Sequence, residues 1–123
     1  MVVEDNHMLL QAISKKLEIN GYQIVPCTSG EQVFTELKEM EQLPDLIWLD
    51  YYLAGVMNGL DVISKLKQDE KWKNIPIVIV SNTASEEKVK VMMSMGATKY
   101  FLKAEYRLDS ILEQIEQLIN NKE

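Results

Sequence analysis

Residues 46–50 read Leu-Ile-Trp-Leu-Asp, four apolar side chains followed by a carboxylate. Such a short, continuous apolar run is typical of a strand that is covered on both faces, as in a parallel β-sheet. Asp50 then lies at the carboxyl end of its strand, where open parallel sheets bind their ligands. This stretch therefore predicts both a class of fold and the position of a reactive residue.

Four other apolar runs have the same character, and amphipathic stretches lie between them. The runs are Val2–Val3, Gln23–Val25, Ile77–Val80 and Tyr100–Leu102, and the helical stretches are 10–17, 33–40, 60–66, 89–93 and 108–119. Ser29, Asn58 and Ser85 stand where helix N-caps are expected. Strand then helix, five times over, predicts an α/β fold with a doubly wound five-stranded parallel sheet.

The size of the chain suits a single domain over residues 1–123. An apolar fraction of 46% is enough for a core. The first strand has only two or three residues before an acidic pair, whereas strands average about 5 to 6. A first strand this short fits a chain that is truncated at its N-terminus.

The net charge of −6 argues against direct binding to nucleic acid or to an anionic membrane surface. Cys27 is the only cysteine, so an internal disulfide is impossible. Neither a signal peptide nor a run of about 20 apolar residues is present, so the cytosol is the expected compartment and no membrane is expected as a partner.

Reactive side chains follow four of the five predicted strands. They are Glu4 and Asp5, Asp50, Ser81, and Lys103. The second strand runs into residues 26–28 without a charge, which favours a place at the edge of the sheet. Three carboxylates that converge repel one another, so a hard cation such as Mg²⁺ or Mn²⁺ is expected between them. Asp50 can then attack phosphorus while Lys103 and Ser81 steady the phosphoryl oxygens.

Taken one by one, these residues have plain structural interpretations. A strand-end aspartate is as often a helix cap, Ser81 alone suits a turn, and Lys103 alone suits a solvated surface. The ordered set is what favours a site. His7 is interpreted as a solvated first-turn residue and is left out of the site. Trp48 and one or two of the methionines at 92, 93 and 95 are expected in the core, and Trp72 is expected to pack in a loop.

The ordered set resembles the receiver domains of two-component response regulators, over essentially the whole chain. The resemblance rests on Glu4-Asp5 after the first strand, Leu49-Asp50, Ser81 and Lys103. It implies a flavodoxin-like sheet with the strand order 2-1-3-4-5, like that of the chemotaxis receiver. It also implies a phosphoprotein that accepts a phosphoryl group on Asp50, a signalling switch rather than an enzyme.

The resemblance assigns further roles residue by residue. Asp5 is implied as a direct metal ligand, Glu4 as a ligand through water, and Asp50 as both ligand and phosphoacceptor. The backbone carbonyl of Tyr52 is implied as another metal ligand. Ser81 and Tyr100 are implied as switch residues that move on phosphorylation.

The implied partners are a histidine kinase or a histidine phosphotransfer protein. Phosphorylation is implied to change the surface formed by the fourth helix, fifth strand and fifth helix, which could also support a homodimer. Some positions depart from the family pattern, namely Ala54 and Ala104 in place of proline, Gly59 one residue later than usual, and Asn82 in place of alanine. Tyr52, two residues beyond the acceptor, is bulky, and we expect it to slow hydrolysis of the phosphorylated state.

Two other interpretations stay open. The first is a phosphohydrolase that passes through an aspartyl phosphate, although such enzymes typically carry a second aspartate where this chain has Tyr52. The second is an interaction module with the same fold that works without phosphorylation, which Ala104 keeps open. Magnesium binding and response to a phosphodonor distinguish these interpretations.

Overall fold

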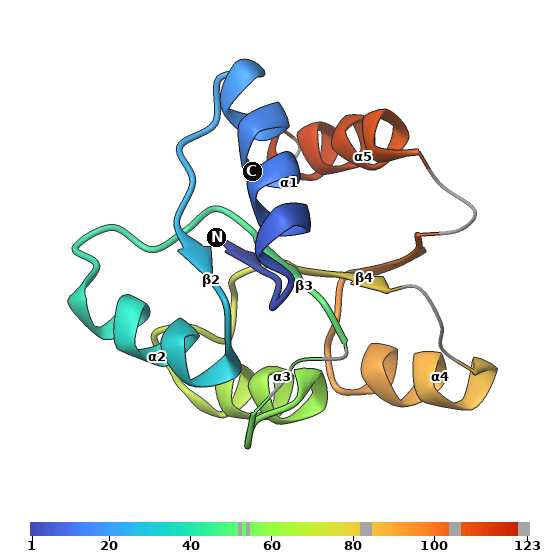
Figure 1. The fold of residues 1–123 in the computed structure, drawn as a ribbon. Coiled ribbons are helices and arrows are strands. Elements are labelled where there is room, and N and C mark those ends of the chain that lie inside the picture. The colour runs from blue at the N-terminus through green and yellow to red at the C-terminus, as the bar shows by residue number, and fades with distance from the viewer. Residues whose placement is uncertain (52, 54, 82–84, 104–106, 121–123) are drawn as a thin grey trace.

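A five-stranded parallel sheet lies at the centre of the computed structural model, which describes residues 1–51, 53, 55–81, 85–103 and 107–120 (Figure 1). The strands are β1 (Val2–Val3), β2 (Pro26–Cys27), β3 (Ile47–Leu49), β4 (Ile77–Ser81) and β5 (Lys99–Leu102). All neighbouring strands are parallel, and their order is β2-β1-β3-β4-β5. The predicted fold and strand order are confirmed, including the edge position of the second strand.

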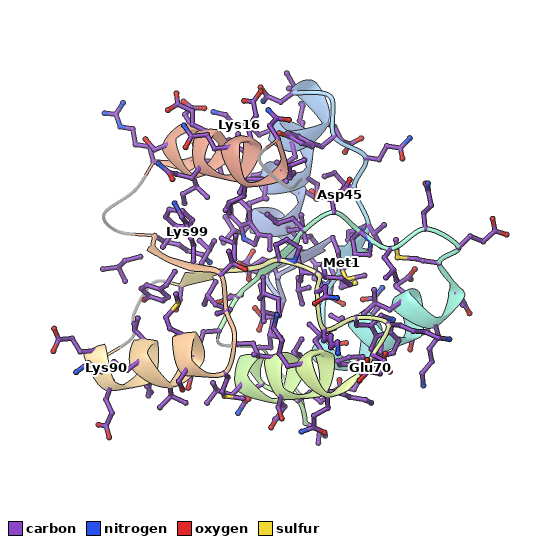
Figure 2. All side chains as sticks on the ribbon, turned by 180° about the vertical axis from the view of Figure 1, so that it is seen from behind. Met1, Lys16, Asp45, Glu70, Lys90 and Lys99 are labelled. Atoms are coloured by element: carbon purple, nitrogen blue, oxygen red, sulfur yellow. The ribbon has the colours of Figure 1, made fainter. Side chains whose placement is uncertain are left out.

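Helices cover both faces of the sheet. They are α1 (His7–Ile19), α2 (Gly30–Glu39), α3 (Gly59–Gln68), α4 (Glu86–Ser94) and α5 (Leu108–Asn120). In Figure 1, α1 and α5 lie on one face, and α2, α3 and α4 lie on the other. The view from behind shows Met1 in the sheet layer between the two helix layers (Figure 2).

Side-chain caps fix where the helices begin. Ser29, Asn58 and Ser85 each accept a hydrogen bond from a backbone N–H in the first turn, as predicted. Asn6, the residue directly after the acidic pair, caps α1 in the same way. The capping residues therefore set the helix starts next to the carboxyl ends of the strands.

Alternation along the strands divides the core into two parts. One part, beneath α2, α3 and α4, includes Val3, Ile47, Leu49, Ile77 and Ile79, and the other, beneath α1 and α5, includes Val2, Trp48, Val78, Val80 and Phe101. Each buried aliphatic side chain contributes about 1.5 to 3 kcal/mol. The burial of both sheet faces explains why the strands are continuously apolar in sequence.

The second strand begins later than predicted. Residues 23–25 were expected to form it, but the paired residues are Pro26 and Cys27. The reason is the length of β1, because Val2 and Val3 are level with Pro26 and Cys27 and no strand residue lies beside 23–24. Pro26 is tolerated because an edge strand has free N–H positions.

Most of the remaining core predictions are confirmed. Trp48 is buried, Met92 is fully buried, and Met95 packs against the core from a partly buried position. Trp72 is also buried, in the turn after α3, where its ring lies 5.5 Å from that of Phe34. Among the described residues, no helix combines the length and apolar character needed to cross a membrane.

Candidate phosphoacceptor site

The register of the strands brings the acidic residues together. Val3 of β1 is level with Leu49 of β3, and the Asp50 amide donates to the Val3 carbonyl at 3.0 Å. Glu4 and Asp50 are the next residues of these two adjacent strands. They must therefore lie side by side at the carboxyl edge of the sheet.

Glu4, Asp5 and Asp50 form a cluster that fits a divalent cation. Each carboxylate places one oxygen within 4.8 Å of an oxygen of the other two. Glu4 is 1% exposed and Asp50 is 7% exposed, while Asp5 is half-buried. Mg²⁺ and Mn²⁺ prefer oxygen ligands, and the cluster offers only oxygens. The donor set therefore suits the cation that the sequence predicted.

Lys103 lies against this cluster and is closest to Glu4. Its Nζ donates to Glu4 Oε1 at 2.9 Å and lies 3.8 Å from Asp50 Oδ2. The lysine is placed by the backbone, because its amide donates to the Ser81 carbonyl at 2.7 Å just beyond paired strands β4 and β5. The sequence predicted that Lys103 belongs to the site but did not predict its preference for Glu4.

Glu4 stays ionised in spite of its burial. Burial alone raises the pKa of its carboxyl, but hydrogen bonds from Lys103 and from the Asn6 amide, together with the charge of Lys103, hold that pKa below its usual value. The Asn6 amide lies 3.2 Å from Glu4 Oε2, so each carboxylate oxygen has a donor. Glu4 therefore keeps a negative charge within the cluster.

Ser81 comes from β4, the strand beside β3, and Tyr100 comes from β5, on the far side of β4. Ser81 is the last residue of β4 and is fully buried, level with Leu102 of β5. Tyr100 is half-buried, packs against the core beneath α4, and has a buried hydroxyl oxygen. It also lines a groove of about 520 Å³ with residues of α4 and α5, among them Val89, Met93 and Gln114.

The segment after Asp50 is held from two sides. The Gly59 amide donates to the Tyr51 carbonyl at 3.0 Å, and Glu31 of α2 accepts from the Met57 amide at 2.8 Å. Sequence reasoning missed Glu31, whose only signal was an acidic residue in the first turn of a helix. Tyr52, whose carbonyl was predicted as a metal ligand, lies outside the described residues, as do Ala54, Asn82 and Ala104.

His7 is exposed at the start of α1, which confirms that it is a solvated first-turn residue. The candidate site in the described part of the chain thus consists of Glu4, Asp5, Asp50, Ser81 and Lys103. A carboxylate nucleophile, a cluster of oxygens for a hard cation and a partly buried lysine beside it are groups that suit phosphoryl acceptance on an aspartate.

Comparison with known proteins agrees with this geometry. The family model described as the response regulator receiver domain matches residues 1–116. The polar-differentiation response regulator DivK of Brucella ovis is 31% identical over 103 residues, which cover 84% of this chain and 81% of DivK. The phosphate regulon transcriptional regulatory protein PhoB of Rhizobium meliloti is 29% identical over 102 residues, 83% of this chain.

The matched region makes up only 44% of PhoB and 14% of the two-component response regulator-like protein PRR37 of rice. The receiver domain of the Francisella response regulator 1452 superposes with a TM-score of 0.86 at 20% identity, covering 99% of this chain and 96% of that one. The phosphorylated cyanobacterial phytochrome response regulator RcpA gives 0.84 at 24% identity, with 99% and 93% covered. These likenesses show the same fold.

Proposed function

The chain belongs to the response regulator receiver domain family, whose model matches residues 1–116, and we propose that it accepts a phosphoryl group on Asp50 from a partner's phosphohistidine. The observation that carries the proposal is the convergence of Glu4, Asp5 and Asp50 with Lys103 at one edge of the sheet. A purely structural carboxylate needs no such neighbours. The protein is proposed to be a switch, whose only chemistry is acceptance and loss of its own phosphoryl group.

The transfer is an exchange of one bond to phosphorus for another. A carboxylate oxygen of Asp50 attacks phosphorus, the bond between phosphorus and the histidine nitrogen breaks, and the imidazole takes a proton from solvent. Loss of the group consumes one water and returns the carboxylate and inorganic phosphate. Lys103 Nζ, already 3.8 Å from Asp50, is placed to pair with a phosphoryl oxygen.

Mg²⁺ or Mn²⁺, when bound, supplies positive charge against the oxygens of the reacting phosphoryl group. Asp5 and Asp50 are proposed as direct ligands and Glu4 as a ligand through water. The Tyr52 carbonyl is kept as a proposed ligand on the family resemblance alone. Lys103 holds Glu4, which leaves Asp5 and Asp50 as the carboxylates best able to bind directly.

Ser81 and Tyr100 are proposed to transmit the effect of phosphorylation from Asp50 to the surface of the domain. A phosphoryl group on Asp50 adds negative charge and acceptor oxygens beside the hydroxyl of Ser81. Tyr100 lies on the neighbouring strand and lines the groove between α4 and α5, so its movement would change that surface. This surface is proposed to bind a downstream partner or a second copy of the chain. Residues 1–123 are proposed to act as one receiver domain in the cytosol, where the buried free thiol of Cys27 is stable.

A direct test is intact-mass measurement after incubation with Mg²⁺ and a small-molecule phosphodonor. We expect the mass to increase by one phosphoryl group. This increase should be absent when a metal chelator is added before the phosphodonor. Asp50→Asn should show no added phosphoryl group. Asp45→Asn is the matched control, since Asp45 lies just before β3, and it should react like the parent. Phosphorylation of Asp50→Asn would refute the assignment, and no reaction at all would favour the interaction module that works without phosphate.

A further inference from the structure

The loop that follows Asp50 comprises residues 51–58, and its two ends are joined. The Gly59 amide, at the start of α3, donates to the Tyr51 carbonyl at 3.0 Å. Tyr51 and Leu53 are each 8% exposed and belong to the part of the core beneath α2, α3 and α4. Compact surface loops with joined ends are packed by their own side chains in this way. The first part of the loop is therefore anchored by buried residues of its own.

The second part of the loop is much more exposed. Val56 is 93% exposed, Gly55 is exposed with a φ of +98°, and Met57 is partly buried against the core. The left-handed backbone at Gly55 favours glycine, which has no side chain to bury. A segment with so little buried apolar surface depends on polar contacts with another element for its position.

The start of α2 supplies such a contact. Glu31 Oε1 accepts a hydrogen bond from the Met57 amide at 2.8 Å, across a separation of 26 residues. A Cβ added to Gly55 would lie 3.4 Å from Glu31 Oε2, and a Cβ added to Gly30 would lie 2.7 Å from the Met57 Cβ. Two consecutive residues of α2 thus lie against the loop, and Figure 1 shows the start of α2 close to α3, where the loop ends.

The same end of α2 is also connected to the acidic cluster. Cys27 is the last residue of β2, and its carbonyl accepts from the Glu4 amide at 2.9 Å. Ser29, two residues later, caps α2 and so places Glu31 in the first turn of the helix. Glu31 therefore links the strand that is hydrogen-bonded to Glu4 with the loop that begins after Asp50.

The electrostatics of the helix alone do not explain this contact. A negative charge in the first turn of a helix is favourable, and the exposed Glu31 would satisfy that preference in water. Its carboxylate instead accepts a charge-assisted hydrogen bond from an amide of a distant loop. Among the described residues the acidic cluster consists of Glu4, Asp5 and Asp50, so Glu31 acts on that cluster through the loop.

We propose that Glu31 is a positioning residue for the cation site, which holds the loop through the Met57 amide and so keeps Asp50 in the orientation that binds Mg²⁺ together with Asp5. This inference rests on the proposed function, in which Mg²⁺ supports phosphoryl acceptance. Without the hydrogen bond, the exposed part of the loop moves away from α2, and the backbone after Asp50 moves with it. The cluster then binds Mg²⁺ less tightly although all of its carboxylates are present.

The test compares Glu31→Ala with Glu31→Gln, whose amide oxygen can still accept from Met57. Glu31 is exposed, so both variants should fold. In calorimetric titration, Ala should raise the dissociation constant for Mg²⁺ at least about fivefold, and Gln should change it less than about twofold. Hydrogen exchange at the Met57 amide should be at least about tenfold faster in the Ala variant only. Glu39→Ala, an exposed change at the other end of α2, is the matched control and should behave like the parent.

The Gln variant separates the hydrogen bond of Glu31 from its charge. If Ala and Gln weakened Mg²⁺ binding equally, the charge would matter instead of the hydrogen bond, and the proposal would be wrong. Faster exchange at Met57 with an unchanged dissociation constant would show a contact that is structural only, and would also overturn it. A parent that bound no Mg²⁺ would contradict the proposed function and this inference with it, whereas a parent that bound Mg²⁺ no more tightly than Glu31→Ala would contradict this inference alone.

Discussion

Lys103 is the main reason why Glu4 can be both ionised and buried. The exposed fraction of the Glu4 side chain is 2%, that of Lys103 is 16%, and their charged atoms are 2.9 Å apart. An ion pair with so little water around it leaves a costly unpaired charge when one partner is removed. The lysine therefore stabilises the cluster when no metal is bound, and it also competes with a metal ion for the negative charge of the carboxylates.

We expect Lys103→Met to separate these two effects. Without Mg²⁺ the free energy of unfolding should fall by about 3 kcal/mol, because Glu4 loses its charge partner. Mg²⁺ should bind about threefold or more tightly, because a positive charge leaves the cluster. Urea denaturation and calorimetric titration measure the two quantities.

Lys99→Met is the matched control for that change. Lys99 is the first residue of β5, the strand that Lys103 directly follows, and its Nζ donates to Gln114 Oε1 at 2.8 Å, outside the acidic cluster. It should leave Mg²⁺ affinity unchanged. A Lys103 variant that bound Mg²⁺ no better than the Lys99 variant would contradict the competition between lysine and metal.

The amino group of Met1 should make stability depend on pH. Its pKa is about 6 in the folded protein and near 8 in the unfolded chain, so between these values the unfolded state binds more protons. The free energy of unfolding therefore rises with pH across this window, by about 2 to 3 kcal/mol from this group. Below pH 6 the penalty is complete, and above pH 8 it is absent.

Acetylation of Met1 gives the control, since the acetylated nitrogen cannot titrate. His7 is exposed and is common to both forms, so its contribution cancels in the difference. Urea denaturation at pH 5.5, 7 and 8.5 should show a steeper rise for the free amine than for the acetylated protein. Parallel pH profiles would show that the charge on Met1 costs nothing in the folded state.

The residues of the site could be predicted because strand ends are readable in the sequence. Asp50 and the acidic pair each follow an apolar run, and parallel strands bring such positions to one edge. The preference of Lys103 for Glu4 could not be predicted, because it depends on side-chain conformations rather than on spacing. Glu31 was missed for a similar reason, since its partner Met57 lies 26 residues away.

At the level of elements, the start of α3 is pressed against the end of β3. Gly59 is the first residue of this helix, and a Cβ added to it would lie 2.8 Å from the Tyr51 carbonyl oxygen and 2.9 Å from the Tyr51 Cα. Backbone atoms cannot turn away as a flexible side chain can. The capping box of Asn58 and Asp61 also fixes the helix start, so the contact has no easy way to relax.

Gly59→Ala should therefore destabilise the domain by about 1 to 3 kcal/mol. Because Tyr51 is next to Asp50, the same change should slow phosphorylation by a small-molecule donor. Gln68→Ala, an exposed change at the other end of α3, should affect neither quantity by much. Unchanged urea midpoints and rates in the Gly59 variant would mean that α3 moves freely relative to β3.

The extent of β2 shows where reading elements from sequence fails. Residues 23–25 have the apolar pattern of a strand, yet pairing begins only at Pro26. A strand is defined by its neighbour, and β1 offers only two residues to pair with. Local pattern predicted the existence and edge position of β2, and its length was set by another part of the chain.

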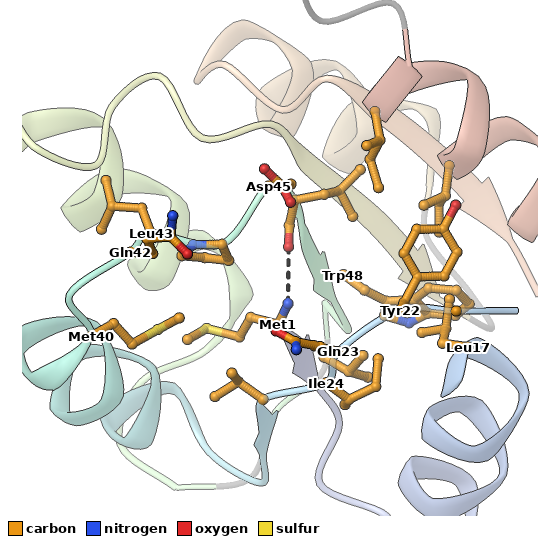
Figure 3. Close-up of a pocket in the computed structure, with 17 residues that line it drawn as sticks. Met1, Leu17, Tyr22, Gln23, Ile24, Met40, Gln42, Leu43, Asp45 and Trp48 are labelled. Atoms are coloured by element: carbon orange, nitrogen blue, oxygen red, sulfur yellow. Dashed lines mark hydrogen bonds between the residues drawn. The ribbon is translucent and has the colours of Figure 1, made fainter. Parts of the chain in front are cut away.

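For the whole molecule, the carboxyl and amino edges of the sheet differ in the side chains that they bring together. Glu4, Asp5, Asp50, Ser81 and Lys103 lie at the carboxyl edge, while the amino edge contains a pocket of about 380 Å³ lined by Met1, Val25 and Leu46 (Figure 3). Strands β1 and β3 run from one edge to the other, and the acidic pair directly follows β1. Binding of a cation at the carboxyl edge should therefore stabilise the entire sheet.

We expect Mg²⁺ at ten times its dissociation constant to raise the free energy of unfolding by about 1.4 kcal/mol, or about 5 °C in thermal midpoint, because the folded state alone brings the three carboxylates together. Asp5→Asn should abolish most of this rise, since it removes a proposed direct ligand. Asp109→Asn, which changes an aspartate paired with Lys16 on the surface between α1 and α5, should keep it.

The expected direction of the change in the free energy of unfolding without metal makes this prediction specific. Asp5→Asn removes one of three converging negative charges, so it should stabilise the metal-free domain while it removes the response to Mg²⁺. A variant that was simply misfolded would be less stable in both conditions. If Asp5→Asn kept the full rise with Mg²⁺, the cation would bind elsewhere, and the acidic cluster would have to be explained by Lys103 alone.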